Sequence, residues 1–387
     1  MTQNKNKRLL ALDILRGITI AGMILVNNPG SWGHIYAPLG HAQWNGLTPT
    51  DLVFPFFMFI MGISTYFSLR KYKFEFTKEA GKKILKRTVV IFAIGLGIAW
   101  FGLFIRTWNS LGGEELNFFS RLGQSAFVFD RLRILGVMQR LALTYCATAL
   151  IALTVKHKYI PYLIGAILVV YAGILWLGNG FEYNETNILS IVDRAILGEN
   201  HMYRDNGIDP EGLLSTLPAI AHVLLGFHIG RLFTEQKEIH LKVETLFIAG
   251  AILTFSGLLL SYGCPINKKV WSPTFVLTTC GLASTLLGLL IWIIDIKGHK
   301  KSFTFFESFG VNPLFIYVTG AILTICFGSI LFPYGEGSIT IHGFLYRIVL
   351  LPLLGTYNAS LAYALLFVTL NWVIGYQLYK RNIYIKI

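Results

Sequence analysis

Charge is scarce in this sequence of 387 residues, because Asp, Glu, Lys and Arg together make up only 14% of it. A soluble globular domain carries about 25% of these residues. Hydrophobic residues account for 54% of the chain. Several runs of about 18–20 residues contain almost no charge, and this length crosses a bilayer. A large soluble α/β protein is therefore excluded. A membrane β-barrel is excluded as well, since its short segments of alternating polarity are missing.

Cysteine and acidic residues are also few. The four cysteines are scattered, and no two of them have the spacing of metal ligands. His222 and His228 are six residues apart, which is poor spacing for a metal pair, so we expect no metal. The formal net charge is +13. In a membrane protein such an excess is first explained by the basic residues that fix orientation, so we expect no nucleic-acid partner.

The apolar runs predict an all-α polytopic membrane protein with about ten transmembrane helices. The basic N-terminal stretch leads into a run that we interpret as a first spanning helix and not as a cleaved signal. The segment 341–357 is apolar but could be a re-entrant or interfacial helix and not a spanning one. We expect loops over 106–130 and 179–212. The ten helices are expected at residues 9–28, 51–69, 88–105, 134–154, 160–178, 213–233, 246–262, 274–296, 310–332 and 360–379.

The distribution of basic residues predicts the orientation of these helices. Segments assigned to the cytoplasm contain 22 of the 33 Lys and Arg residues, and the stretch 70–87 is the most basic. By the positive-inside rule, both termini should be cytoplasmic and the segment 27–55 should lie on the other side. We therefore expect one transmembrane domain over residues 1–387, located in the cytoplasmic (inner) membrane and in contact with the lipid bilayer.

The segment 27–55, which we call the hinge, carries more chemistry than a connector between two membrane helices needs. It contains a histidine, His41, in a stretch broken by glycine and proline. Imidazole is the usual proton-transfer group at neutral pH, although a loop histidine with no task is a plausible alternative. Polar and aromatic residues surround His41 in the sequence: Asn27, Asn28, Trp44, Asn45 and Asp51.

Charged residues inside spanning segments are costly and usually have a partner or a task. Asp13 and Arg16 share one face of the first helix, as a structural ion pair or as the wall of a cofactor entrance. Arg133 and Arg140, with Gln139 beside them, would suit an anion such as a phosphate. Packing of these arginines against the acidic outer loop is equally plausible.

Two further segments offer polar groups at helix starts. Asp209 and Glu211 come just before the expected sixth helix, where they could cap it or face a cationic or hydroxylated substrate. Asn312 precedes Pro313 at another helix start and offers its amide to the membrane interior.

The sequence resembles the family of transmembrane acyltransferases typified by lysosomal heparan-α-glucosaminide N-acetyltransferase and its bacterial relatives. The most specific match is His41-Ala42…Trp44-Asn45-Gly46-Leu47-Thr48…Asp51-Leu52-Val53-Phe54-Pro55. Weaker matches in the same order extend over nearly the whole chain: Leu12-Asp13…Arg16-Gly17, Val26-Asn27, Arg131…Arg133…Gln139-Arg140, Asp209-Pro210-Glu211-Gly212, Asn267-Lys268…Trp271-Ser272 and Gly310…Asn312.

The resemblance implies an enzyme that moves an acetyl group from cytoplasmic acetyl-CoA to a glucosamine-like amino sugar or glycan on the non-cytoplasmic side. It implies that His41 is catalytic, and we expect Asn27 to hold the thioester oxygen. The chain departs from the family at Asn28-Pro29-Gly30-Ser31, where relatives have a glycine run. The other expected site residues divide between the acceptor (Trp44, Asn45, Asp51, Asp209 and Glu211) and acetyl-CoA (Asp13, Arg16, Arg133, Gln139, Arg140 and Asn312).

Two alternatives stay open from the sequence. Direct transfer with His41 as the base and a route through acetyl-His41 fit equally well. An amino-sugar transporter with a midplane site is the second functional class. A homodimer is a further expectation, and the hinge should dip toward a central site so that His41 can meet a thioester from the other side.

Overall fold

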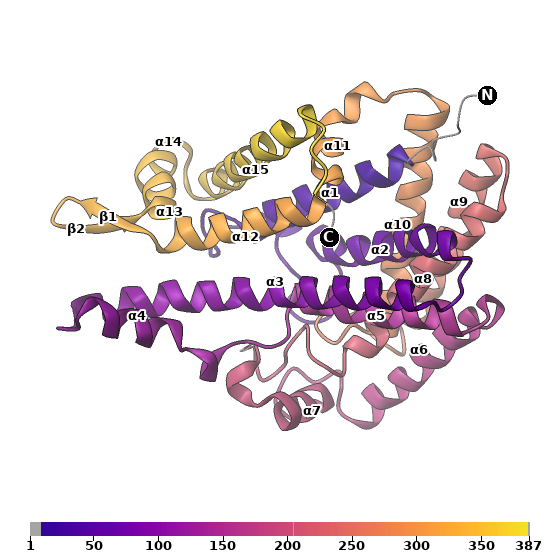
Figure 1. Cartoon of the computed structure of the whole chain (residues 1–387), viewed down its shortest axis with the longest axis horizontal. Helices are drawn as coiled ribbons and strands as arrows, with labels where there is room; N and C mark the ends of the chain where they lie inside the picture. The colour runs from indigo at the N-terminus through magenta and orange to yellow at the C-terminus, as the bar shows by residue number, and fades with distance from the viewer. Residues whose placement is uncertain (1–8, 204, 386–387) are drawn as a thin grey trace.

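The computed structural model describes residues 9–203 and 205–385, and these residues are mainly helical (Figure 1). Within this described part, nine helices are long and apolar enough to cross a membrane. The helices in these spans are α1 (Leu10–Asn27), α2 (Val53–Leu69), α3 (Lys78–Ser110), α5 (Val137–Thr154), α6 (Ile160–Leu177), α8 (Thr216–Glu235), α9 (Ile239–Leu260), α10 (Pro273–Ile291) and α15 (Thr356–Lys380).

A bent pair of helices is the candidate for a tenth span or for a re-entrant segment. Helices α11 (Thr304–Val311) and α12 (Pro313–Ser329) meet at Asn312 with a bend of 74°. Pro313 is the first residue of α12, where its fixed φ suits a helix start and its missing N–H costs nothing. The prediction of an all-α polytopic protein with about ten spans is therefore confirmed. The location of the two termini stays a prediction.

Several smaller elements lie between the spans. The loops expected over 106–130 and 179–212 contain the helices α4 (Phe118–Ala126) and α7 (Ile188–Leu197), so the prediction of plain loops there was wrong. The strands β1 (Leu331–Tyr334) and β2 (Gly337–Thr340) form an antiparallel hairpin in which Leu331 pairs with Thr340. The segment Ile341–Leu354 is a short apolar helix, partly π-helical.

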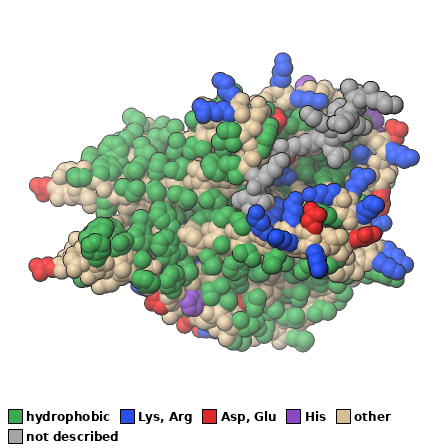
Figure 2. Space-filling model, viewed as in Figure 1, with side chains coloured by type: hydrophobic (Ala, Val, Ile, Leu, Met, Phe, Trp, Pro, Cys, Tyr) green, Lys and Arg blue, Asp and Glu red, His purple; other side chains and the backbone are tan. Residues whose placement is uncertain are grey.

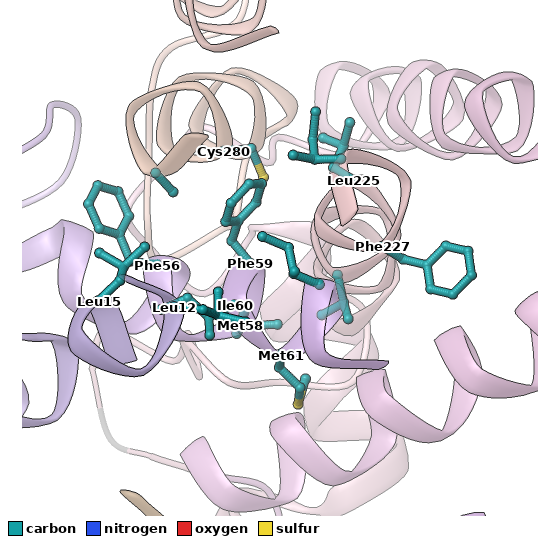
Figure 3. Packing of buried hydrophobic residues seen from close by; sticks show 14 of the residues in the cluster. Leu12, Leu15, Phe56, Met58, Phe59, Ile60, Met61, Leu225, Phe227 and Cys280 are labelled. Carbon is teal, nitrogen blue, oxygen red and sulfur yellow. The ribbon is translucent and has the colours of Figure 1, made fainter. Parts of the chain in front are cut away.

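Helices α1, α2, α8 and α10 contribute most of the labelled apolar core in Figure 3, including Leu15, Phe59, Leu225 and Cys280. The backbones of α2 and α8 approach closely because each helix carries a glycine at the contact. A Cβ added to Gly62 would lie 2.2 Å from the carbonyl oxygen of Val223, and one added to Gly226 would lie 2.2 Å from that of Phe59. Small residues permit such close packing of membrane helices.

The two ends of the bundle differ in chemistry. Figure 2 shows Lys and Arg side chains gathered toward one end, while the visible face of the other end is mainly apolar. Figure 1 places α4 and the β1–β2 hairpin at this second end. Such one-sided basic charge is the pattern on which the positive-inside rule relies.

Candidate active site

The hinge is folded back on itself, and this fold presents His41. A 3₁₀ turn over Pro49–Leu52 leads into α2, and Thr48 and Asp51 form a reciprocal capping box at its start. The hydroxyl of Thr48 donates to the carbonyl oxygen of Gly40 at 2.8 Å, and that of Thr50 donates to Pro38 at 3.1 Å. The Thr-Pro-Thr-Asp sequence therefore ties the start of α2 to the residues just before His41.

Asp51 orients the imidazole of His41. Its carboxylate is 1% exposed and lies 2.7 Å from His41 Nδ1. It also accepts hydrogen bonds from the backbone N–H of Ala42 at 3.1 Å and of Thr48 at 3.2 Å. A contact this short with a carboxylate favours the tautomer that carries its hydrogen on Nδ1, and this tautomer leaves Nε2 as an acceptor. The side chain of His41 is 42% exposed, so Nε2 has the geometry of an accessible general base.

A lysine distant in sequence completes this group. The Nζ atom of Lys268 lies 3.1 Å from His41 Nδ1 and 3.2 Å from Asp51 Oδ1. Burial lowers the pKa of the Lys268 ammonium, while Asp51 and Glu211 act in the opposite direction. In the sequence, Lys268 stands out only as part of a matched family motif, which predicts no role for it. No local sequence pattern could link Lys268 to His41, because 227 residues separate them. The family motif was therefore the one available signal.

A second charged cluster joins Arg133 to Asp209 and Glu211. The Arg133 guanidinium lies 2.5 Å from Asp209 Oδ1 and 2.7 Å from Glu211 Oε2. Burial alone would raise the pKa of Glu211, but Arg133 and Arg140 hold it below its usual value. The charge of Glu211 also acts to raise the pKa of Lys268, so the two clusters are coupled electrostatically.

A cavity of about 270 Å³ lies deeper along the same helices. Arg16, Ser64 and Arg87 supply its polar lining, and apolar residues of α2, α3, α5 and α12 supply most of the rest. Arg16 contacts Asp13 at 2.7 Å and donates to the Ser64 hydroxyl at 2.8 Å. Arg16 and Ser64 are each 11 residues from the hinge-side end of their helix, or about 16 Å at 1.5 Å per residue.

The comparisons with known proteins identify the family of this chain. A family model described as the catalytic region of heparan-alpha-glucosaminide N-acetyltransferase matches residues 8–262. This match includes His41, Asp51, Arg133 and Glu211. The chain belongs to this family.

Two curated relatives extend the comparison beyond the family model. Heparan-alpha-glucosaminide N-acetyltransferase from Homo sapiens is 28% identical over an alignment 368 residues long, and the match covers 80% of this chain and 52% of the relative. The protein of the same name from Mus musculus is 26% identical over an alignment 374 residues long, and the match covers 82% of this chain and 54% of the relative. The chain thus spans about half the length of the curated relatives it matches.

Some residues expected at this family's site have other contacts in the structure. Arg140 is 1% exposed, donates to the carbonyl oxygen of Gly212 at 3.1 Å and to the Ser215 hydroxyl, and packs over the Trp271 ring. Gln139 is 3% exposed, and a Cβ on Gly95 would lie 2.5 Å from its oxygen. Both side chains are enclosed by protein, and their predicted contact with acetyl-CoA stays a prediction.

Four further expected site residues have protein partners in the structure, and their contacts with substrates stay predictions. Arg133 was assigned to acetyl-CoA and Asp209 and Glu211 to the acceptor, but one ion-pair cluster holds all three. Asp209 is 0% exposed, which leaves Glu211 and Arg133 as the accessible members. Asp51 was also assigned to the acceptor, but its carboxylate is buried behind His41 and bonded to protein groups.

Trp44 and Asn45 help to build the walls of the site. Trp44 donates to the carbonyl oxygen of Phe181 at 2.7 Å and stacks on Tyr183, with ring centroids 4.6 Å apart. Asn45 accepts from the Asn267 amide at 3.1 Å. These contacts hold the hinge against two other outer loops. Contact between either side chain and an acceptor stays a prediction.

The two asparagines at the end of α1 differ in environment. Asn28 is buried, donates to the carbonyl oxygen of Ile24 at 2.7 Å and accepts from the Thr324 hydroxyl at 2.6 Å. Asn27 is exposed, so its amide is open to a ligand, and its predicted oxyanion role stays a prediction. Asn312 instead binds the segment after α15, through contacts of 2.8 Å with Ile383 and Ile385.

The histidines on α8 bear on the question of a metal. His222 is fully buried, and its Nε2 lies 2.9 Å from the carbonyl oxygen of Pro55. Among residues 9–203 and 205–385, no group of three or more His, Cys, Asp and Glu side chains is placed to hold a metal ion.

Proposed function

We propose that this chain is an acyltransferase that moves the acetyl group of acetyl-CoA to the amine of a glucosamine-like acceptor. Family membership and the names of the two relatives support an N-acetyltransferase. The observation that carries the proposal is the accessible His41 held by the buried Asp51 at 2.7 Å. Acyl transfer to an amine needs such a base, because the attacking nitrogen must lose a proton.

His41 would act first as a base and then as an acid. Its Nε2 takes a proton from the acceptor amine while the nitrogen attacks the thioester carbonyl carbon. The new C–N bond forms, the C–S bond breaks, and the imidazolium returns the proton to the leaving sulfur. Asp51 is the positioning residue, because its negative charge stabilises the imidazolium. Direct attack by His41 Nε2 on the thioester would instead give an acetyl-histidine intermediate.

Asn27 is proposed to donate its amide N–H to the thioester oxygen as negative charge develops there. Glu211 is proposed to bind the acceptor, because its carboxylate is 14% exposed and lies next to Lys268 and Arg133. Its acceptor atoms suit the hydroxyl and ammonium groups of an amino sugar. Arg133 would then keep Glu211 ionised.

The cavity below the hinge is the proposed site for the acetyl-CoA co-substrate. Its residues fit this ligand, since an apolar wall suits a flexible chain and the guanidinium groups of Arg16 and Arg87 suit phosphates. The Nε atom of Arg87 is buried and has no hydrogen-bond partner among the described residues. Asp13 would hold Arg16 in place. We also propose that acetyl-CoA enters from the cytoplasm and that the acceptor lies on the other side, and the one-sided basic charge supports this orientation.

One assay tests the proposal directly. The purified chain in lipid nanodiscs is given acetyl-CoA and glucosamine, and free CoA is followed with a thiol reagent. We expect CoA release that requires both substrates and falls by about 10² or more in His41→Ala, the range for a lost general base. Full activity in His41→Ala would contradict both chemical routes. Acetylated His41 formed with acetyl-CoA alone would select the acetyl-histidine route.

The transporter alternative predicts a different result in the same preparation. Sealed vesicles would accumulate glucosamine without acetyl-CoA and without release of CoA. The curated relatives are named as N-acetyltransferases, and no observation favours transport. Location in the inner membrane and a homodimer stay predictions.

A further inference from the structure

Lys268 stands beside the His41–Asp51 pair and has no part in the chemistry proposed above. Its Nζ atom lies within 3.2 Å of both Nδ1 of His41 and Oδ1 of Asp51. Its side chain is 18% exposed, so the ammonium is largely shielded from water. A positive charge this close changes how an imidazole and a carboxylate share a proton.

The loop that carries Lys268 is held against the hinge by hydrogen bonds. It is hydrogen-bonded to the hinge at Asn45 and Gly46, because Gly46 N–H donates to Ile266 at 2.8 Å and the Asn267 amide donates to Asn45 at 3.1 Å. Asn267 also accepts from the N–H of Val270 at 3.1 Å. The backbone at Lys268 is thus fixed relative to His41.

The charges around this group come from three segments. Asp51 faces His41 and Lys268 from the hinge, and Glu211 faces Lys268 from the segment before α8. Lys269 points to a different pair of partners, Asp205 at 2.8 Å and the Tyr183 hydroxyl at 2.7 Å. Burial lowers the pKa of Lys268, and the carboxylates of Asp51 and Glu211 counteract that fall. These two carboxylates therefore stabilise the charged lysine at this position.

Asp51 alone would create a difficulty for catalysis. A carboxylate next to an imidazole favours the protonated form, and a protonated His41 cannot accept a proton from the acceptor. A second, positive neighbour favours the neutral imidazole by the same electrostatic rule. When both Asp51 and Lys268 are present, Asp51 can orient the His41 ring. The imidazole can still keep Nε2 unprotonated until the acceptor binds.

We propose that Lys268 is a positioning residue that shares Asp51 with His41 and keeps the imidazole neutral and ready to accept a proton. This inference rests on the proposed function, because it takes His41 as the base. Lys268 is not placed in contact with either substrate.

The first test is the pH dependence of kcat/KM for acetyl transfer to glucosamine. In Lys268→Met the acid limb should move to higher pH by about one unit or more, so that activity at the foot of the limb falls about tenfold. The plateau at high pH should change far less. Lys268→Arg should restore the wild-type limb. Lys269→Met is the matched control, because it removes the neighbouring charge, and its acid limb should stay in place.

A second test needs no transferase activity. Diethyl pyrocarbonate modifies neutral imidazole, and mass spectrometry of the His41 peptide gives the reaction rate at each pH. We expect the midpoint of this titration to rise by about one unit or more in Lys268→Met and to stay unchanged in Lys269→Met. Thermal unfolding checks that each variant is folded, and Lys268→Gln gives the same comparison if the methionine variant is not.

The outcomes separate the two proposals. An unchanged chemical titration in a folded Lys268 variant overturns the role of Lys268, whatever the activity. An equal shift of the titration midpoint in Lys269→Met also overturns the role of Lys268, because loss of any nearby positive charge would then have the same effect. Full activity of His41→Ala would instead refute the proposed function, while the chemical titration would still report on Lys268.

Discussion

At the scale of single residues, Asp51 is the side chain with the most specific arrangement of partners. Replacing it with Asn removes the negative charge that stabilises the imidazolium while keeping the side-chain volume. We expect Asp51→Asn to lower kcat by about 10² or more and to leave KM for acetyl-CoA within about twofold. Steady-state CoA release measures both constants. Asp205→Asn, which alters the contacts of Asp205 with Lys269 and the Tyr183 hydroxyl, is the control, and an equal loss of kcat there would contradict this role of Asp51.

A second prediction at this scale concerns how protonation of the Asp193 carboxyl group affects the stability of the fold. Burial raises its pKa to about 6, although the backbone N–H groups of Leu213 and Leu214 favour the charged form. A carboxyl group with a raised folded pKa stabilises the fold below its unfolded pKa of about 4. That contribution is lost as the pH rises through about 6.

The neutral substitution Asp193→Asn should therefore stabilise the fold relative to wild type at high pH only. Relative to wild type, its Tm should rise between about pH 4 and pH 8, by an amount equivalent to at most about 3 kcal/mol. Thermal unfolding in detergent at the two pH values measures this difference. The exposed Glu199→Gln substitution should show no such trend. A Tm difference that is independent of pH would contradict the assignment.

At the scale of helices, the contact between α2 and α8 makes the sharpest prediction. A Cβ at Gly62 would lie 2.2 Å from the carbonyl oxygen of Val223, so the two backbones must separate to admit it. Gly62→Ala should destabilise the protein by about 1–3 kcal/mol, the usual cost of overpacking. Gly165→Ala on α6 is the control, because nothing lies within 4 Å of the added Cβ. Similar Tm values for the two variants would contradict the close contact.

The sequence could predict the long helices because length and hydropathy are local properties. It missed α4 and α7, since short amphipathic helices within polar stretches have no apolar run of spanning length. It allowed for packing of Arg133 against the acidic loop, which the ion pairs with Asp209 and Glu211 confirm, but it missed Lys268 as a partner of His41. Arg133 and Asp209 are 76 residues apart, and Lys268 and His41 are 227 apart, so only packing of the helices brings these charges together.

At the scale of the whole molecule, the cavity and the hinge occupy different depths of the same helices. If acetyl-CoA enters the cavity, Arg87→Ala should raise KM for acetyl-CoA by about tenfold, the cost of one charge-assisted contact of about 1.4 kcal/mol. KM for glucosamine should not change. Arg231→Ala, which removes a basic residue paired with Glu235, is the control. A rise in KM for glucosamine alone would place the acceptor in the cavity instead.

The asymmetry of charge between the two ends predicts which end faces the cytoplasm. Lys82 lies on the basic part of α3 and Ser120 lies on α4, and both are exposed. By the positive-inside rule, Lys82 should be cytoplasmic and Ser120 should be outside. In a background without the four native cysteines, a membrane-impermeant maleimide added to intact cells should therefore label Ser120→Cys and spare Lys82→Cys. Permeabilised cells, in which both should react, are the control for reactivity. Labelling of Lys82→Cys alone in intact cells would invert the orientation, and His41 would then share the compartment in which acetyl-CoA is made.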